Sequence, residues 1–134
     1  MKLAMIGLGK MGGNMATRLL RHKIEVVGFD FNTDTVNKLA TEEGLIAAKS
    51  VADAVIKLSG QKIVWIMLPS GDITEKQIEA LIPMLNKDDI IIDGGNSNYK
   101  DSQRRGAMLA EHGIGFMDSG TSGGVWGLEN GYCL

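Results

Sequence analysis

The sequence contains a single cysteine, Cys133, and only 2 prolines. One cysteine excludes a disulfide framework within the chain, so a reducing cytoplasm is the expected compartment. Because Cys133 has no set of metal-ligating partners, we expect it to be a buried apolar residue and expect no metal site. The scarcity of proline beside 18 glycines is not typical of a linker or a low-complexity segment.

Long apolar runs and clusters of one charge sign are also missing. The net charge is −2 with both signs interspersed, which argues against a nucleic-acid partner. No apolar run is long enough to span a bilayer, and we expect no signal peptide because Met1 leads directly into the apolar stretch at 3–6. What remains is a chain of 134 residues with the composition of one globular domain, spanning 1–134.

Short apolar runs alternate with amphipathic stretches along this chain. The pattern predicts strands followed by helices, which means βαβ units and a mainly parallel sheet. We therefore predict a Rossmann-like, doubly wound α/β fold with three layers and helices on both faces of the sheet. The start of one further strand is expected at 132–134. The predicted strands are 2–6, 25–29, 62–68, 89–92 and 115–117, and the predicted helices are 11–21, 33–43, 50–58, 73–85 and 99–111.

A glycine-rich turn separates the first predicted strand from the first helix. Its spacing is G-x-G-x-x-G, and its position between strand and helix is the one that dinucleotide binding requires. The first glycine allows a tight turn, the second lets a pyrophosphate approach the backbone, and the third permits close packing of helix on strand. A glycine turn without a ligand is the alternative. The predicted cofactor-binding residues here are Gly7, Leu8, Gly9, Lys10, Met11 and Gly12.

An acidic residue, Asp30, follows the second predicted strand. A carboxylate at this place accepts hydrogen bonds from the adenosine ribose, and its charge would repel a 2′-phosphate. The next residues, Phe31 and Asn32, offer no arginine to receive such a phosphate. We therefore predict NAD rather than NADP as the cofactor, with capping of the next helix as the alternative role of Asp30.

Two segments of the second half resemble 6-phosphogluconate dehydrogenase closely. One runs from Asp93 through Asn96 and Ser97 to Arg104 and Arg105, and the other covers 118–124. The glycine turn is shared with the wider β-hydroxyacid dehydrogenase group. The resemblance extends over essentially the whole chain. It implies oxidative decarboxylation of the sugar phosphate 6-phosphogluconate to ribulose 5-phosphate in the pentose phosphate pathway, a part of gluconate metabolism.

The resemblance also implies roles for particular residues. Leu68, Pro69 and Ser70 would lie along the cofactor, and Asn96 would contact both nicotinamide and substrate. Ser122, Gly123 and Gly124 would form the substrate-binding loop. The alternatives are a helix cap for Asn96 and Ser97, and a plain loop at 122–124. We expect Arg104 and Arg105 to lie on a solvated helix face.

The resemblance places the catalytic lysine and its acidic partner beyond Leu134, so we expect no catalytic residue within 1–134. We also expect the chain to lack a C-terminal helical domain that binds substrate and dimerises, which would make the parent protein a homo-oligomer. On this reading the chain binds NAD weakly and turns nothing over. Two other functions stay open. One is that of another β-hydroxyacid dehydrogenase, such as the hydroxyisobutyrate type, and the other is that of a non-catalytic NAD(H)-sensing module.

Overall fold

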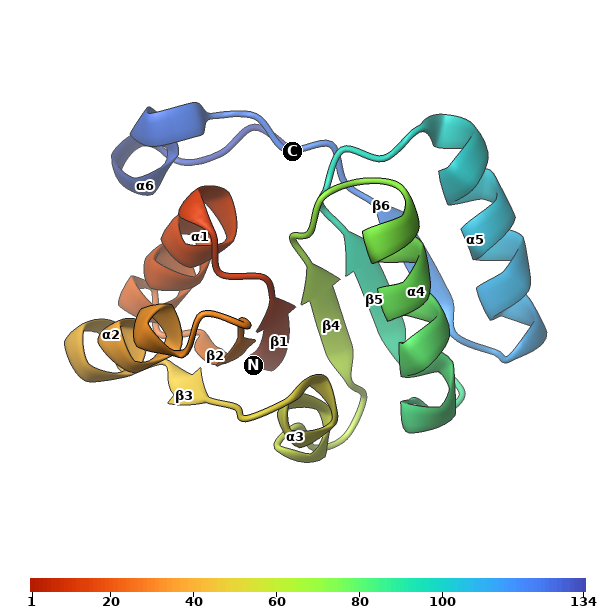
Figure 1. Ribbon diagram of the computed structural model, residues 1–134, viewed down its shortest axis with the longest axis horizontal. Helices are drawn as coiled ribbons and strands as arrows, with labels where there is room; N and C mark the ends of the chain where they lie inside the picture. Colours follow the sequence, from red (N-terminus) through yellow and green to blue (C-terminus); the bar gives the residue numbers. More distant parts are fainter.

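The computed structural model describes the backbone of residues 1–134 and every side chain except that of Val125. Six parallel strands form one sheet in the order β3-β2-β1-β4-β5-β6 (Figure 1). This order, which turns back at β1 and β4, confirms the predicted doubly wound fold. The strands are β1 Lys2–Ile6, β2 Glu25–Phe29, β3 Ile46–Ala47, β4 Ile63–Ile66, β5 Ile90–Asp93 and β6 Gly115–Asp118.

Helices pack on both faces of the sheet and give the three layers. The apolar sides of α1 and α2 pack over β1 and β2, while α3, α4 and α5 pack on the opposite face. Two short 3₁₀ helices, η1 and η2, complete the secondary structure. The bounds are α1 Lys10–Arg21, α2 Thr33–Glu43, α3 Val51–Ile56, α4 Asp72–Leu81, η1 Ile82–Met84, α5 Tyr99–Glu111, η2 Gly124–Trp126 and α6 Gly127–Asn130.

The two faces of β4 and β5 differ in burial. Side chains toward α4 and α5, such as Val64 and Ile91, are fully buried. Their neighbours on the other face are only half-buried: Ile63, Trp65, Ile90 and Ile92. These four residues are called the half-buried face below. The strands therefore show the burial alternation that a sheet acquires when one face is covered less completely.

Four local expectations differ from the structure. The helix predicted over 73–85 ends as α4 at Leu81 and continues as η1, because Pro83 has no N–H for an α-helical bond. The two-residue strand β3 was not predicted, and at 132–134 there is only a single antiparallel bridge between Ser122 and Cys133. Cys133 is exposed, so the prediction that it is buried was wrong.

The carboxyl ends of the parallel strands meet at one edge of the sheet, the upper edge in Figure 1. The turns after β1, β2, β4, β5 and β6 all lie there, which is where open α/β sheets bind ligands. The C-terminal segment with α6 crosses the same edge and packs on α1. Each helix that the structure describes is too short or too polar to traverse a lipid bilayer.

Candidate functional site

The glycine turn between β1 and α1 is held by contacts that only glycine allows. Gly7 has φ of 94°, and a Cβ atom on it would overlap the carbonyl oxygen of Met67. A Cβ atom on Gly12 would overlap the carbonyl oxygen of Gly7. Both glycines are therefore required by the fold itself, as expected for a tight turn and close packing of helix on strand.

Gly9 differs from its two neighbours in the motif. Its φ of −61° is open to any residue, and a Cβ atom built on it meets nothing within 4 Å. The protein itself therefore gives no reason for glycine at this position. Gly9 is the N-cap of α1, which has no side-chain cap and no acidic residue in its first turn. The first amides of α1 lack intrahelical acceptors and carry the positive end of the helix dipole, so the space beside Gly9 suits an anion.

Asp30 joins the turn after β2 to the glycine turn. Its Oδ2 accepts a hydrogen bond of 2.7 Å from the Leu8 amide, and its Oδ1 accepts one of 2.8 Å from the Asn32 amide. The side chain of Asn32 caps α2 by accepting from the amides of Asp34 and Thr35. Capping is thus performed by Asn32, and the carboxylate of Asp30 lies beside the glycine turn.

A small pocket collects several of the predicted residues from separate parts of the chain. Gly7, Asp30, Phe31 and Leu68 meet around it at the ends of β1, β2 and β4. Phe31 is 88% exposed, so its ring is available to a ligand. Pro69 and Ser70, which follow Leu68, are exposed at the same edge of the sheet. The full lining is Ile6, Gly7, Phe29, Asp30, Phe31, Leu68 and Gln77.

Asn96 connects the turn after β5 to the segment after β6. Its Oδ1 accepts from the Thr121 amide at 2.9 Å, and its Nδ2 donates to the Thr121 carbonyl at 3.3 Å. The N-cap of α5 is Asn98, so neither Asn96 nor Ser97 caps that helix. Asn96 has φ of 57°, a conformation that asparagine tolerates better than most residues. Thr121 is buried and was not singled out by sequence reasoning.

The predicted substrate loop lies directly after Thr121. Ser122 is exposed, but its amide donates to the carbonyl of Cys133 at 3.0 Å and so is not free for a ligand. Gly123 and Gly124 have φ of 151° and 49°, which favour glycine. The loop conformation thus depends on both glycines, and the Ser122 hydroxyl is its exposed polar side chain.

The prediction that both arginines of α5 are solvated was wrong for Arg105. Arg104 is exposed, but the side chain of Arg105 is only 1% exposed. Arg105 pairs with the buried carboxylate of Asp93 and with Glu75 of α4. Hydrogen bonds from Arg104 and, to a smaller extent, from Arg105 lower the pKa of Glu75 to about 2. This carboxylate therefore stays ionised well below the pH at which an ordinary glutamate is protonated.

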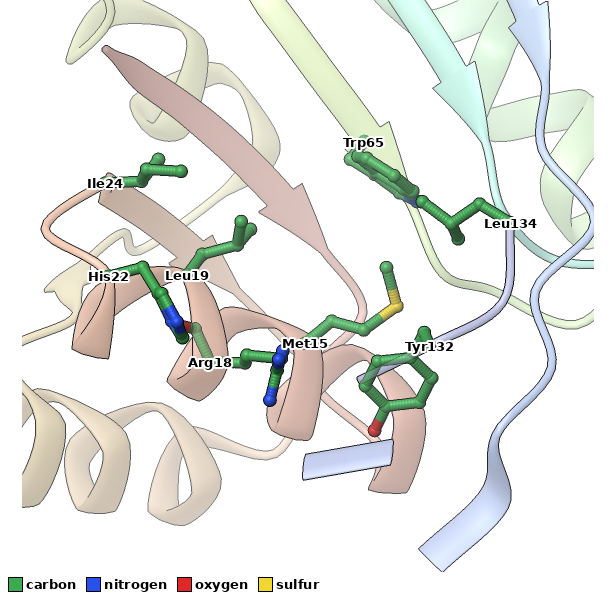
Figure 2. A pocket seen from close by; sticks show the side chains of 8 residues that line it. All are labelled: Met15, Arg18, Leu19, His22, Ile24, Trp65, Tyr132 and Leu134. Atoms are coloured by element: carbon green, nitrogen blue, oxygen red, sulfur yellow. The ribbon is translucent and has the colours of Figure 1, made fainter. Parts of the chain in front are cut away.

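A larger groove of about 400 Å³ lies away from the glycine turn. Figure 2 shows side chains of α1, among them Met15 and Leu19, on one side of it and Trp65 of β4 on the other. Its lining is mostly apolar, and Trp65 Nε1 and the Tyr132 hydroxyl are buried beside it without hydrogen-bond partners. It shares no residue with the small pocket at Asp30, and none of the predicted site residues lines it.

A doubly wound sheet with a glycine turn opening α1 and a carboxylate after β2 defines a Rossmann-type dinucleotide-binding domain. Comparison with known families gives the same class in more detail. The chain belongs to the family of NAD-binding domains of 6-phosphogluconate dehydrogenase, whose profile matches residues 2–134.

Individual relatives agree with this assignment. The chain is 40% identical over 134 residues to an NAD(+)-dependent, decarboxylating 6-phosphogluconate dehydrogenase of Haloferax volcanii, covering all of this chain and 44% of the relative. Among solved structures, the 6-phosphogluconate dehydrogenase of Plasmodium falciparum superposes with a TM-score of 0.89 at 27% identity, over 98% of this chain and 29% of that one. The 3-hydroxyisobutyrate dehydrogenase of Mycobacterium tuberculosis gives 0.84 at 27% identity, over 94% and 42%. The chain therefore spans less than half the length of these relatives.

Proposed function

We propose that this chain binds NAD⁺ at the edge of the sheet formed by the turns after β1, β2, β4 and β5. The observation that carries the proposal is the open space beside Gly9 at the uncapped start of α1. A pyrophosphate fits there because it would accept hydrogen bonds from the first amides of α1 and contact a backbone without a side chain. When bound, the cofactor supplies the hydride acceptor of a dehydrogenase.

The residues around that space have separate roles in this proposal. Gly7, Leu8, Gly9, Lys10, Met11 and Gly12 form the pyrophosphate turn. The carboxylate of Asp30 accepts hydrogen bonds from the adenosine ribose, while Phe31 and Asn32 flank it. Leu68, Pro69 and Ser70 lie along the middle of the cofactor.

The proposed cofactor is NAD⁺ and not NADP⁺. Asp30 lies beside the glycine turn, where a 2′-phosphate would approach its charge. The Haloferax relative is named NAD(+)-dependent, while the Plasmodium structure is described with NADP⁺, so either cofactor occurs in the family. The residues of this chain decide the choice.

Exchanging the charge after β2 is expected to reverse this choice. The double variant Asp30→Ala, Phe31→Arg should bind NADP⁺ at least about tenfold more tightly than NAD⁺, since it removes a repulsive carboxylate and adds a partner for phosphate. Calorimetric titration of both cofactors measures the effect. Asp34→Ala with Thr33→Arg changes the net charge equally at the exposed start of α2 and should keep the NAD⁺ preference. Tighter binding of NADP⁺ than of NAD⁺ by the unaltered chain would refute the assignment.

We further propose that the protein containing this domain oxidatively decarboxylates 6-phosphogluconate to ribulose 5-phosphate in the cytoplasm. Support comes from membership of the family and from the hydrogen bonds between Asn96 and Thr121, which tie the turn after β5 to the residue directly before Ser122, Gly123 and Gly124. In this proposal Asn96 and Ser122 contact the substrate, and the general base comes from outside residues 1–134. The parent enzyme is a homo-oligomer.

A 3-hydroxyisobutyrate dehydrogenase is the second candidate, since such an enzyme superposes nearly as well. NAD⁺ reduction by an enzyme that carries this domain, measured with each substrate in turn, separates the two. We expect turnover with 6-phosphogluconate and little with hydroxyisobutyrate, and none with either for the 134-residue chain alone, because proton transfer needs a positioned base. Robust turnover by the 134-residue chain would contradict the placement of the base.

A further inference from the structure

Arg105 uses every nitrogen of its buried guanidinium group. Nε donates to Glu75 at 2.6 Å, and Nη2 donates to the carbonyl of Gly71 at 3.3 Å. Nη1 donates to Oδ2 of Asp93 at 3.2 Å and to the hydroxyl of Ser97 at 3.0 Å. Ser97 in turn donates to the same Asp93 oxygen at 2.5 Å. One side chain of α5 is therefore bonded to α4 and to the turns that follow β4 and β5.

Those two turns contain residues of the proposed site. Gly71 directly follows the segment 68–70, and Ser97 directly follows Asn96. Asn96 then holds the backbone of Thr121, which directly precedes the proposed substrate loop. The hydrogen bond from Arg105 to Ser97 and the pair between Asn96 and Thr121 are joined by the backbone between Asn96 and Ser97, so the guanidinium is connected to the segment after β6.

From these contacts we infer that Arg105 is a positioning residue, which fixes the turns after β4 and β5 relative to each other and, through Asn96, the loop at Thr121. The inference rests on the proposed function, since it gives Arg105 the role of keeping that same binding site ordered. Arg105 touches neither the glycine turn nor Asp30 in the contacts described, so its effect would be confined to the part of the site that follows β4, β5 and β6.

The chemistry of this position suggests that arginine serves to position the neighbouring turns more than to stabilise the fold. A buried ion pair is often replaceable by apolar residues without loss of stability, because desolvation offsets the attraction. A planar guanidinium, in contrast, presents donors in several fixed directions at once, whereas an ammonium group is a single point charge. Lysine could keep the charge beside Asp93 and Glu75, but it could not donate to Gly71, Asp93 and Ser97 in fixed directions at once.

The backbone at Asn96 gives a reason for such an anchor. A left-handed conformation is unfavourable for a residue with a side chain, so it persists only where the surroundings fix it. Here the fixing contacts come from both sides. Ser97 is hydrogen-bonded to Asp93 and Arg105, and the side-chain oxygen of Asn96 accepts a hydrogen bond from the Thr121 amide. Loss of the guanidinium group should therefore disorder the turn at Asn96 before it affects the strands of the sheet.

The test is amide hydrogen exchange on the ¹⁵N-labelled 134-residue chain, combined with calorimetric titration of NAD⁺. Arg105→Lys should speed exchange of the Thr121 amide by about tenfold relative to the amides of β1, and should weaken NAD⁺ binding several-fold. Arg104→Lys is the matched control, because Arg104 bonds Glu75 and Asp101 but neither turn, and it should alter both readouts less than twofold. Ser97→Ala removes the hydrogen bond to Arg105 without changing any charge, and it should also speed exchange of the Thr121 amide. This variant provides the test if Arg105→Lys does not fold.

Two outcomes would overturn the inference. One is equal acceleration at Thr121 and in β1, which would make Arg105 a contributor to global stability only. The other is an unchanged Thr121 amide in both Arg105→Lys and Ser97→Ala. Failure of the unaltered chain to bind NAD⁺ is a different result. It would contradict the proposed function, while the exchange pattern would still decide whether Arg105 positions the loop.

Discussion

Replacing Gly9 by valine is expected to weaken NAD⁺ binding at least about a hundredfold, while the free energy of unfolding falls by only about 1 kcal/mol, the usual cost of a poor N-cap residue. The physical reason is that a Cβ atom on Gly9 meets no protein atom within 4 Å and the backbone there already has an extended conformation that valine adopts. The branched side chain would instead fill the space that the pyrophosphate needs at the start of α1. Calorimetry measures the affinity, and circular dichroism on heating measures the stability.

Gly7→Ala is the matched control for this variant. A methyl group there collides with the Met67 carbonyl, and φ of 94° is unfavourable for alanine, so stability should fall. The two variants should therefore separate a glycine required by a ligand from a glycine required by the fold. Wild-type affinity in Gly9→Val would show that the pyrophosphate does not bind at this turn.

Replacing Asp93 by alanine should lower the free energy of unfolding by about 3–5 kcal/mol, since this is the usual cost of removing one partner of a buried ion pair. The carboxylate is fully buried and accepts hydrogen bonds from Arg105, Ser97 and the Gly95 amide. Without it the Arg105 guanidinium keeps only Glu75 as a charged partner. Urea denaturation followed by circular dichroism gives the free energy.

Asp118 provides the comparison, because it occupies the position in β6 that pairs with Asp93 in β5. It is exposed and accepts one hydrogen bond from Ser102, so Asp118→Ala should cost less than about 1 kcal/mol. Similar losses for the two variants would mean that the buried network around Arg105 contributes no more than an ordinary surface contact.

Elements with a strong local signal could be predicted from the sequence. The helices at 33–43 and 99–111 and the strands at 2–6 and 25–29 have the predicted bounds, because apolar spacing and capping residues agree there. The strand β3 could not be predicted, since two residues are too few to show any periodicity. Its place depends on pairing with β2, which is a tertiary contact.

The site could be predicted only in part. The spacing of the glycines and the acidic residue after β2 indicated the cofactor turn, and those residues lie together in the structure. The burial of Arg105 could not be predicted from its charge, because a charged residue on a helix is usually exposed. Helical spacing carried the missing signal, since Ser102, Arg105 and Leu109 lie on one face of α5 and all three are buried.

The half-buried face of β4 and β5 has a consequence for how the domain behaves with temperature. Near 25 °C the burial of apolar surface is driven by entropy, and it weakens on cooling. A partner surface that covers Ile63, Trp65, Ile90 and Ile92 through apolar contact should therefore dissociate more readily at about 4 °C than at about 25 °C. High concentrations of sulfate should oppose that dissociation, whereas they would weaken an association based on charge.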